Sequence, residues 1–199
     1  MSAVRLVLFC LLLGGCSTGP DRPAAVPAGF RHLEVVENRI ATLHSIPLVV
    51  SADGSLRTTP ATHRRATFGD HPFEISLAAL VAADAAVMVH AERVADSSGG
   101  SNYDTLPLTG WPDSRFRLRS QCASIDRETA AAEHDLAYLG RNGFDPVGNL
   151  ALDQYFATSP DHNEEVVISI VARVADCSDE AANRSTLSRI RERIHVAVR

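Results

Sequence analysis

The sequence predicts a single α+β domain in which a mostly antiparallel sheet carries helices packed on one side. Three stretches lead to this fold class. Residues 115–122 alternate between apolar and polar side chains, which is typical of a strand with one solvated face. Residues 166–174 are nearly all apolar and rich in β-branched side chains, which indicates a central buried strand. Residues 126–142 carry apolar side chains at helical spacing, which predicts a helix between the two strands.

The first half of the chain is predicted from the same patterns. Apolar residues at helical spacing predict an amphipathic helix over 31–44, which Pro47 ends. Asp53-Gly54 between two short apolar runs is typical of a hairpin turn. Residues 73–83 fit either a strand or a helix, and we favour a short helix. Residues 86–94 alternate in the manner of a strand.

The second half of the chain shows a repeated order of elements. A long loop over 96–114, rich in glycine, serine and proline, follows the first strand, and long loops in compact domains are often functional. Two further strands over 149–157 and 165–176 precede a final helix, which Ser178 caps. Strand, strand and helix thus occur twice. This order indicates a duplicated unit, although it also arises by chance in α+β domains.

The N-terminus has the three parts of a secretion signal: a basic residue, Arg5, an apolar run over 6–13, and small residues before a cysteine. The apolar run is short of the roughly 20 residues that a membrane-spanning helix needs. The motif Leu13-Gly14-Gly15-Cys16 resembles the lipobox of bacterial lipoproteins. The alternative is an ordinary signal peptide followed by an incidental cysteine.

The resemblance implies that residues 1–15 are removed and that Cys16 becomes an acylated first residue. Several fatty-acyl chains, each contributing about 0.8 kcal/mol per buried CH2, would hold it stably in the lipid bilayer. Residues 16–30 then form a proline-rich flexible tether, and residues 31–199 form a single periplasmic α+β domain. Ser17 stands where an aspartate often retains such proteins in the inner membrane. We therefore expect anchoring at the periplasmic face of the outer membrane.

Cysteine usage predicts one disulfide. Cys10 leaves with the signal peptide and Cys16 carries lipid, so Cys122 and Cys177 remain in an oxidising compartment. Both lie where a predicted strand meets a helix, and a disulfide would tie the strand ends if the strands lay side by side in parallel. The alternative is two buried free thiols. No metal site is predicted, because neither cysteine belongs to a CxxC pair.

Composition narrows the function classes. The formal net charge is −5 with both signs interspersed, and no basic patch indicates a nucleic-acid partner. Every basic residue is arginine, so the Ser-x-x-Lys motif of some hydrolases cannot occur. The sequence contains neither a phosphate-binding loop nor a dinucleotide fingerprint. We therefore expect no cofactor and assign no catalytic residue.

Two small groups of polar residues could carry chemistry. His90 and Glu92 lie two apart on a predicted strand, so they share a face and could act as acid and base or contribute to a zinc site. No motif supplies a third metal ligand, and a solvated strand face is the alternative. Residues 161–165 gather a histidine and carboxylates, but they lack the spacing of a calcium loop and fit a polar hairpin tip.

A row of arginines is the most distinctive predicted surface feature. Arg115, Arg117 and Arg119 share one strand face and could meet an acidic protein or an anionic glycan. They could equally form ion pairs within the protein, with Glu92 as one candidate. Trp111 lies just before them and is either an interface residue or a plug under the long loop.

The function expected from these features is that of a lipid-anchored, non-enzymatic protein that binds another envelope component. That component could be an assembly partner, part of a secretion system or the target of an inhibitor-like protein, with Trp111 and the three arginines as the contact. The first alternative is a small envelope hydrolase that uses His90 and Glu92, with or without a metal. The second is a purely structural lipoprotein.

Overall fold

The computed structural model describes residues 29–100 and 102–198. These residues form eleven β-strands and three short helices. The predicted signal peptide, the lipidation site at Cys16 and nearly all of the tether lie outside the described residues. Within the described part of the chain, no helix has both the length and the apolar character needed to cross a membrane.

The larger of two antiparallel sheets has seven strands in the order β4-β6-β7-β10-β9-β8, and β5 also pairs with β6. In chain order these strands are β4 (Arg57–Thr58), β5 (Thr62–Phe68), β6 (His71–Val81), β7 (Ala85–Val94), β8 (Arg117–Ile125), β9 (Gly148–Thr158) and β10 (Glu164–Arg173). The smaller sheet has the order β1-β2-β3-β11. Its strands are β1 (Leu33–Val36), β2 (Arg39–Thr42), β3 (Leu48–Ala52) and β11 (Ile194–Val198).

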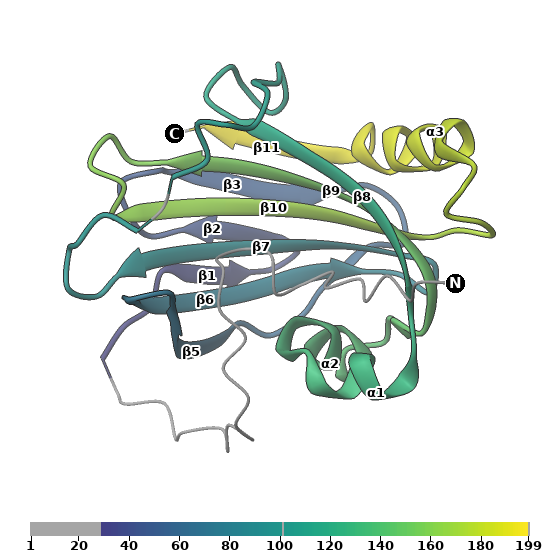
Figure 1. Cartoon of the computed structure of the whole chain (residues 1–199), viewed down its shortest axis with the longest axis horizontal. Coiled ribbons are helices and arrows are strands. Elements are labelled where there is room, and N and C mark those ends of the chain that lie inside the picture. The colour runs from purple at the N-terminus through teal and green to yellow at the C-terminus, as the bar shows by residue number, and fades with distance from the viewer. Residues whose placement is uncertain (1–28, 101, 199) are drawn as a thin grey trace, which may run out of the picture.

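The two sheets are stacked, with β1, β2 and β3 behind the strands of the larger sheet in Figure 1. The main core lies between them, because alternate residues of each strand point to the same face. It includes Val87, Val89 and Ala91 of β7, Val166, Ile168 and Ile170 of β10, and Ile40, Leu48 and Val50 of the smaller sheet. The helix α3 (Glu180–Arg191) adds Leu187 and Ile190 to this core.

The opposite face of the larger sheet is partly covered by two short helices, α1 (Arg127–Ala132) and α2 (His134–Arg141). Leu136 and Leu139 of α2 pack with Met88 and Leu152 of the sheet in a second apolar cluster. The remaining part of this face carries polar side chains, which are described below.

The predicted α+β class is wrong, because the protein is a β-rich fold of two antiparallel sheets with little helix. The predicted helix over 31–44 is the hairpin of β1 and β2, which turns at Glu37 with a φ of 54°. Its apparent apolar stripe is divided between core and solvent. Leu33 is buried, whereas Val36 is 51 % exposed and Leu43 is 46 % exposed.

Residues 73–83, predicted as a short helix, belong to β6. This strand is buried on both faces, so its apolar run has no alternation that separates it from a buried helix. The predicted hairpin at Asp53-Gly54 is also wrong. β3 pairs with β2 and β11, while β4 joins the other sheet, so this turn connects the two sheets.

The strand predicted over 86–94 is confirmed as β7, and the strands predicted in the second half are confirmed as β8, β9 and β10. The final helix is capped by Asp179 in place of Ser178, and the chain continues past it into β11. The duplicated unit is not found. β9 and β10 are neighbours, whereas β7 and β8 lie at opposite sides of that pair.

Candidate functional site

Cys122 and Cys177 form the predicted disulfide. Cys122 lies within β8, and Cys177 lies in the segment between β10 and α3. The condition under which it would tie the ends of two neighbouring parallel strands is not met, because β9 separates β8 from β10 and all pairings are antiparallel. The bond therefore ties the edge strand of the larger sheet to the chain that enters α3.

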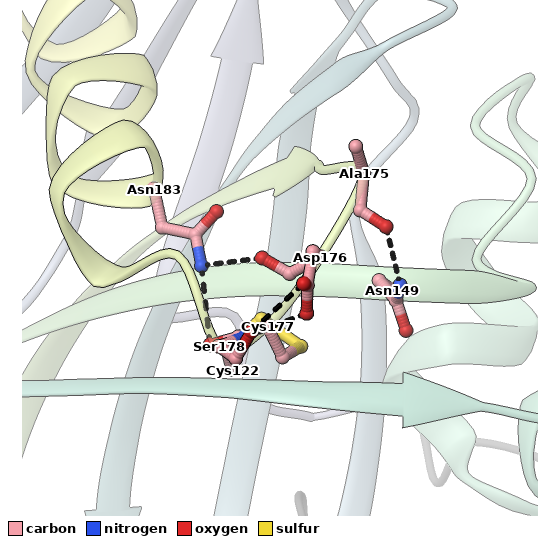
Figure 2. The surroundings of a disulfide bond; sticks show 7 residues. All are labelled: Cys122, Asn149, Ala175, Asp176, Cys177, Ser178 and Asn183. Carbon is pink, nitrogen blue, oxygen red and sulfur yellow. Dashed lines mark hydrogen bonds between the residues drawn. A yellow bond between two sulfur atoms is a disulfide. The ribbon is translucent and has the colours of Figure 1, made fainter.

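Side-chain hydrogen bonds hold the same segment from two other elements (Figure 2). The Asn149 side chain of β9 donates to the carbonyl of Ala175 at 2.8 Å. The Asn183 side chain of α3 donates to the carbonyl of Asp176 at 3.0 Å. Together with the disulfide, these bonds fix the position at which α3 begins. They also close that end of the main core.

His90 and Glu92 lie on the same face of β7, as predicted, but that face is not solvated. His90 is 2 % exposed and Glu92 is 5 % exposed. Their side chains point to the face that α1 and α2 partly cover. The expectation of a solvated strand face is therefore wrong, because residues distant in sequence shield this part of the sheet.

His90 forms a buried ion pair with α2. Its Nε2 lies 3.1 Å from Oδ2 of Asp135, whose Oδ1 lies 3.6 Å from a guanidinium nitrogen of Arg64. Burial favours the neutral imidazole, but the Asp135 carboxylate outweighs it and raises the pKa of His90. Burial likewise opposes ionisation of Asp135, yet His90 and Arg64 hold its pKa well below the usual range. No described residue binds Nδ1 of His90.

Glu92 lies directly across the sheet from Glu165 of β10. Burial first, and then the neighbouring charge of Glu165, raise the pKa of Glu92 to about 8. Tyr103 of the long loop donates its hydroxyl to both oxygens of Glu165, at 3.0 and 3.1 Å. Burial and Glu165 raise the pKa of Tyr103 well above its usual value, so it stays a donor.

Only His90 and Glu92 of this cluster could be predicted from the sequence to lie together. Glu165 was predicted at a polar hairpin tip, but it is 3 % exposed within β10. Asp135, Arg64 and Tyr103 were not predicted to join His90 and Glu92. The only available signal was an ionisable pair, at 90 and 92, inside a strand whose other residues, apart from Arg93, are apolar. Among the described residues, no group of three or more histidine, cysteine or acidic side chains could hold a metal ion.

The arginine row is largely occupied by internal contacts. Arg115 pairs with Asp113 at 2.8 Å, and Arg117 pairs with Asp104 at 2.9 Å. Arg117 also donates to the carbonyl of Leu106, so it fastens the long loop to β8. The Arg119 guanidinium lies 5.3 Å from the centre of the Phe156 ring. The arrangement resembles the intramolecular alternative more than a free anion-binding row.

Trp111 packs edge-on against Tyr155, with ring centres 4.5 Å apart, and contacts the main core. It also lines a cleft of about 510 Å³ beside β11, together with Arg39, Val49 and Val196. The packing agrees with the plug expectation for Trp111, and its role as an interface residue stays a prediction. Its ring supports the long loop and also borders an open surface.

A groove of about 630 Å³ lies between β1 and the chain that joins β4 to β5. Its apolar lining comes from Leu33, Val35, Val36, Pro60 and Ala61, and its polar lining includes Arg31, Glu34, Thr58 and His63. The Thr58 hydroxyl donates to the carbonyl of Glu37, and the rings of Phe30 and His63 meet edge-on. This groove could not be predicted from the sequence, because the residues of β1 fall in the stretch predicted as a helix.

In comparisons with known proteins, no protein-family model, no curated protein and no solved structure matches the chain.

Proposed function

We propose that this protein is a lipid-anchored envelope protein that binds an acidic loop of a partner protein in the β1 groove. Acylated Cys16 would hold it at the periplasmic face of the outer membrane, as the lipobox implies. The observation that carries the proposal is the groove itself, an open concave surface lined by both apolar and polar side chains, with Arg31 among them. Concave, mostly apolar surfaces with a few placed polar groups are the usual form of binding sites.

The charges around the groove support an acidic occupant. Arg31 lines the groove, and Arg57 directly precedes the lining residue Thr58. Both are exposed, and no described carboxylate pairs with either of them. Burial, followed by the charge of Arg31, lowers the pKa of His63, so its ring is neutral at pH 7. The lining then carries one unpaired guanidinium, that of Arg31, and one carboxylate, that of Glu34, while Arg57 lies one residue outside the lining.

The groove is open to solvent, so a loop tip of a partner can enter it. An acidic loop that places a carboxylate beside Arg31 and apolar side chains over Val35 fits both the shape and the charge.

Binding is favoured over catalysis because His90 and Glu92, the pair that a hydrolase would use, are buried in contact with other side chains of the protein. His90 binds Asp135, and Glu92 is buried beside Glu165. A groove lined by ordinary apolar and charged side chains needs no such chemistry to hold a partner. Trp111, Arg117 and Arg119 keep the loop and sheet in place in this account.

Charge reversal at the groove tests the proposal. The full-length acylated protein is crosslinked in its own membranes, purified, and its partners are quantified by mass spectrometry. We expect Arg31→Glu with Arg57→Glu to reduce capture of the dominant partner at least about tenfold, the effect of losing about 1.4 kcal/mol. The matched control reverses Arg184 and Arg189, which are exposed on α3. Equal capture by both double variants would contradict the groove assignment.

A second candidate function, an envelope hydrolase, is favoured by one observation. Glu92 has a pKa of about 8, so it holds its proton at pH 7, as a general acid must. This function predicts that the wild-type protein releases soluble fragments from purified peptidoglycan and that Glu92→Gln abolishes the release. If the wild-type protein releases no fragments, binding remains the proposed function.

A further inference from the structure

The turn between β2 and β3 is attached to the larger sheet through His44. The Nε2 atom of His44 lies 3.1 Å from the carbonyl oxygen of Glu165, at the start of β10. The Nδ1 atom of the same ring accepts the N–H of Ile46 at 3.3 Å. Next to it, the N–H of Ser45 donates to the carboxylate of Glu164 at 2.9 Å. One imidazole therefore joins the smaller sheet to β10 and also holds its own turn in shape.

These two bonds determine the protonation state of the His44 ring. A carbonyl oxygen can only accept, so Nε2 must carry a hydrogen, and a backbone N–H can only donate, so Nδ1 must present a lone pair. The neutral ring with its hydrogen on Nε2 is the form that makes both bonds. A proton added at Nδ1 would point at the N–H of Ile46, so the bond would become a contact between two donors.

A second histidine makes a charge on His44 more costly. The His32 ring is buried, and its centre lies 6.2 Å from the centre of the His44 ring. The Nε2 atom of His32 has no hydrogen-bond partner among the described residues, and it lies 3.6 Å from the Glu74 carboxylate of β6. Two protonated rings at this separation would repel each other, and little water is present to screen them.

Three other charged groups act on the two rings: Arg93 of β7, Glu74 of β6 and Glu164 of β10. The carboxylates favour a charged ring and Arg93 opposes it, while Glu74 is shared with Arg65 of β5 at 2.6 Å. Burial is the largest effect, and it lowers the pKa of both histidines. Both rings are therefore neutral at pH 7, and the folded state loses stability as the pH falls below about 6.5, where unfolded histidine binds a proton.

We propose that His44 is an acid-sensitive switch in the contact between the two sheets. Protonation at Nδ1 breaks the bond to Ile46, and the charged ring gains hydration by turning out into solvent, which breaks the bond to Glu165. The turn over 43–46 then separates from β10. Leu43 N–H donates to the carbonyl of His32 at 2.8 Å, so the start of β1 loses an attachment at the same time. The switch does not depend on what the β1 groove binds.

Hydrogen exchange of backbone amides tests the switch in the full-length acylated protein. After correction for the intrinsic pH dependence of exchange, we expect the protection of residues 45 and 46 to fall at least about tenfold between about pH 7.5 and about pH 5. His44→Gln carries an amide that can donate to Glu165 and does not titrate, so its protection should be the same at both pH values. The matched control is His195→Gln, which changes an exposed histidine of β11 and should behave as the wild type. Burial opposes ionisation of Glu164, but the Ser45 bond lowers its pKa, so this carboxylate stays charged over the range.

The nitrogen-15 chemical shifts of the His44 ring are a second readout that needs no folded variant. We expect the neutral ring with hydrogen on Nε2 at about pH 7.5 and a charged ring only below about pH 6.5. Constant protection of residues 45 and 46 in the wild type, an equal loss in His44→Gln, or a His44 ring already charged at about pH 7 would each overturn the proposal. Neither readout uses a partner, so failure of the groove proposal leaves both of them interpretable.

Discussion

Replacing Cys122 and Cys177 together with alanine is expected to lower the free energy of unfolding by about 4 kcal/mol, because the disulfide closes a loop of 55 residues. For a domain of this size the fall corresponds to roughly 10 °C in the melting temperature. The loss should be larger than for an ordinary surface change, since the bond also holds the segment that enters α3. Thermal unfolding followed by circular dichroism measures it.

Reduction provides the matched control for the disulfide. Dithiothreitol should lower the melting temperature of the wild-type protein to near that of the double variant and leave the variant unchanged. A reductant effect of equal size on both proteins would show that it acts elsewhere. Equal stability of the oxidised wild type and the variant would contradict the structural role given to the bond.

Glu92→Gln is expected to stabilise the protein by an amount that grows with pH. Ionised Glu92 would be buried beside Glu165, which is why its pKa rises from 4.5 to about 8. Between these values the folded chain holds a proton that the unfolded chain has released, so wild-type stability falls by about 1.4 kcal/mol for each pH unit. Glutamine resembles the protonated carboxyl and does not titrate, so the variant escapes this loss.

The expected difference in unfolding free energy is near zero at about pH 4 and reaches several kcal/mol at about pH 8. Other groups change the wild-type profile as well. Burial lowers the pKa of His32 and His44, while Asp135 raises that of His90. The effects of His32 and His44 are common to both proteins and cancel in the difference, whereas the charge of Glu92 contributes to the raised pKa of His90, so that part does not cancel. Denaturant unfolding at five pH values measures it, and a constant difference across the range would contradict a buried, neutral Glu92.

The strands of the second half could be predicted because their patterns are unambiguous. Alternation marks β8, and a β-branched apolar run marks β10, so both were found in the sequence. β6 and the β1–β2 hairpin were missed for opposite reasons. β6 is apolar on both faces, and the hairpin places apolar residues on two short strands at spacings that imitate a helix. Without β1 and β2, the second sheet could not be predicted.

The burial of the polar cluster around His90 and Glu92 could not be predicted from the sequence either. The shared face of His90 and Glu92 follows from their spacing on one strand. Their burial depends on Asp135, which is 45 residues from His90, and on Tyr103 of the long loop. Contacts at such separations depend on how strands are ordered in the sheet, and local patterns do not determine that order. The β1 groove depends on the contact between the two sheets, so it could not be predicted from the sequence for the same reason.

Site-resolved crosslinking in native membranes tests the central claim, partner binding in the β1 groove, most directly. A photocrosslinking residue replaces Glu34 inside the groove in the full-length acylated protein, and Ser185 on α3 serves as the control position. The account predicts one dominant envelope protein crosslinked from position 34, absent from position 185 and lost after charge reversal at Arg31 and Arg57. The same products from both positions, or none from position 34, would contradict it.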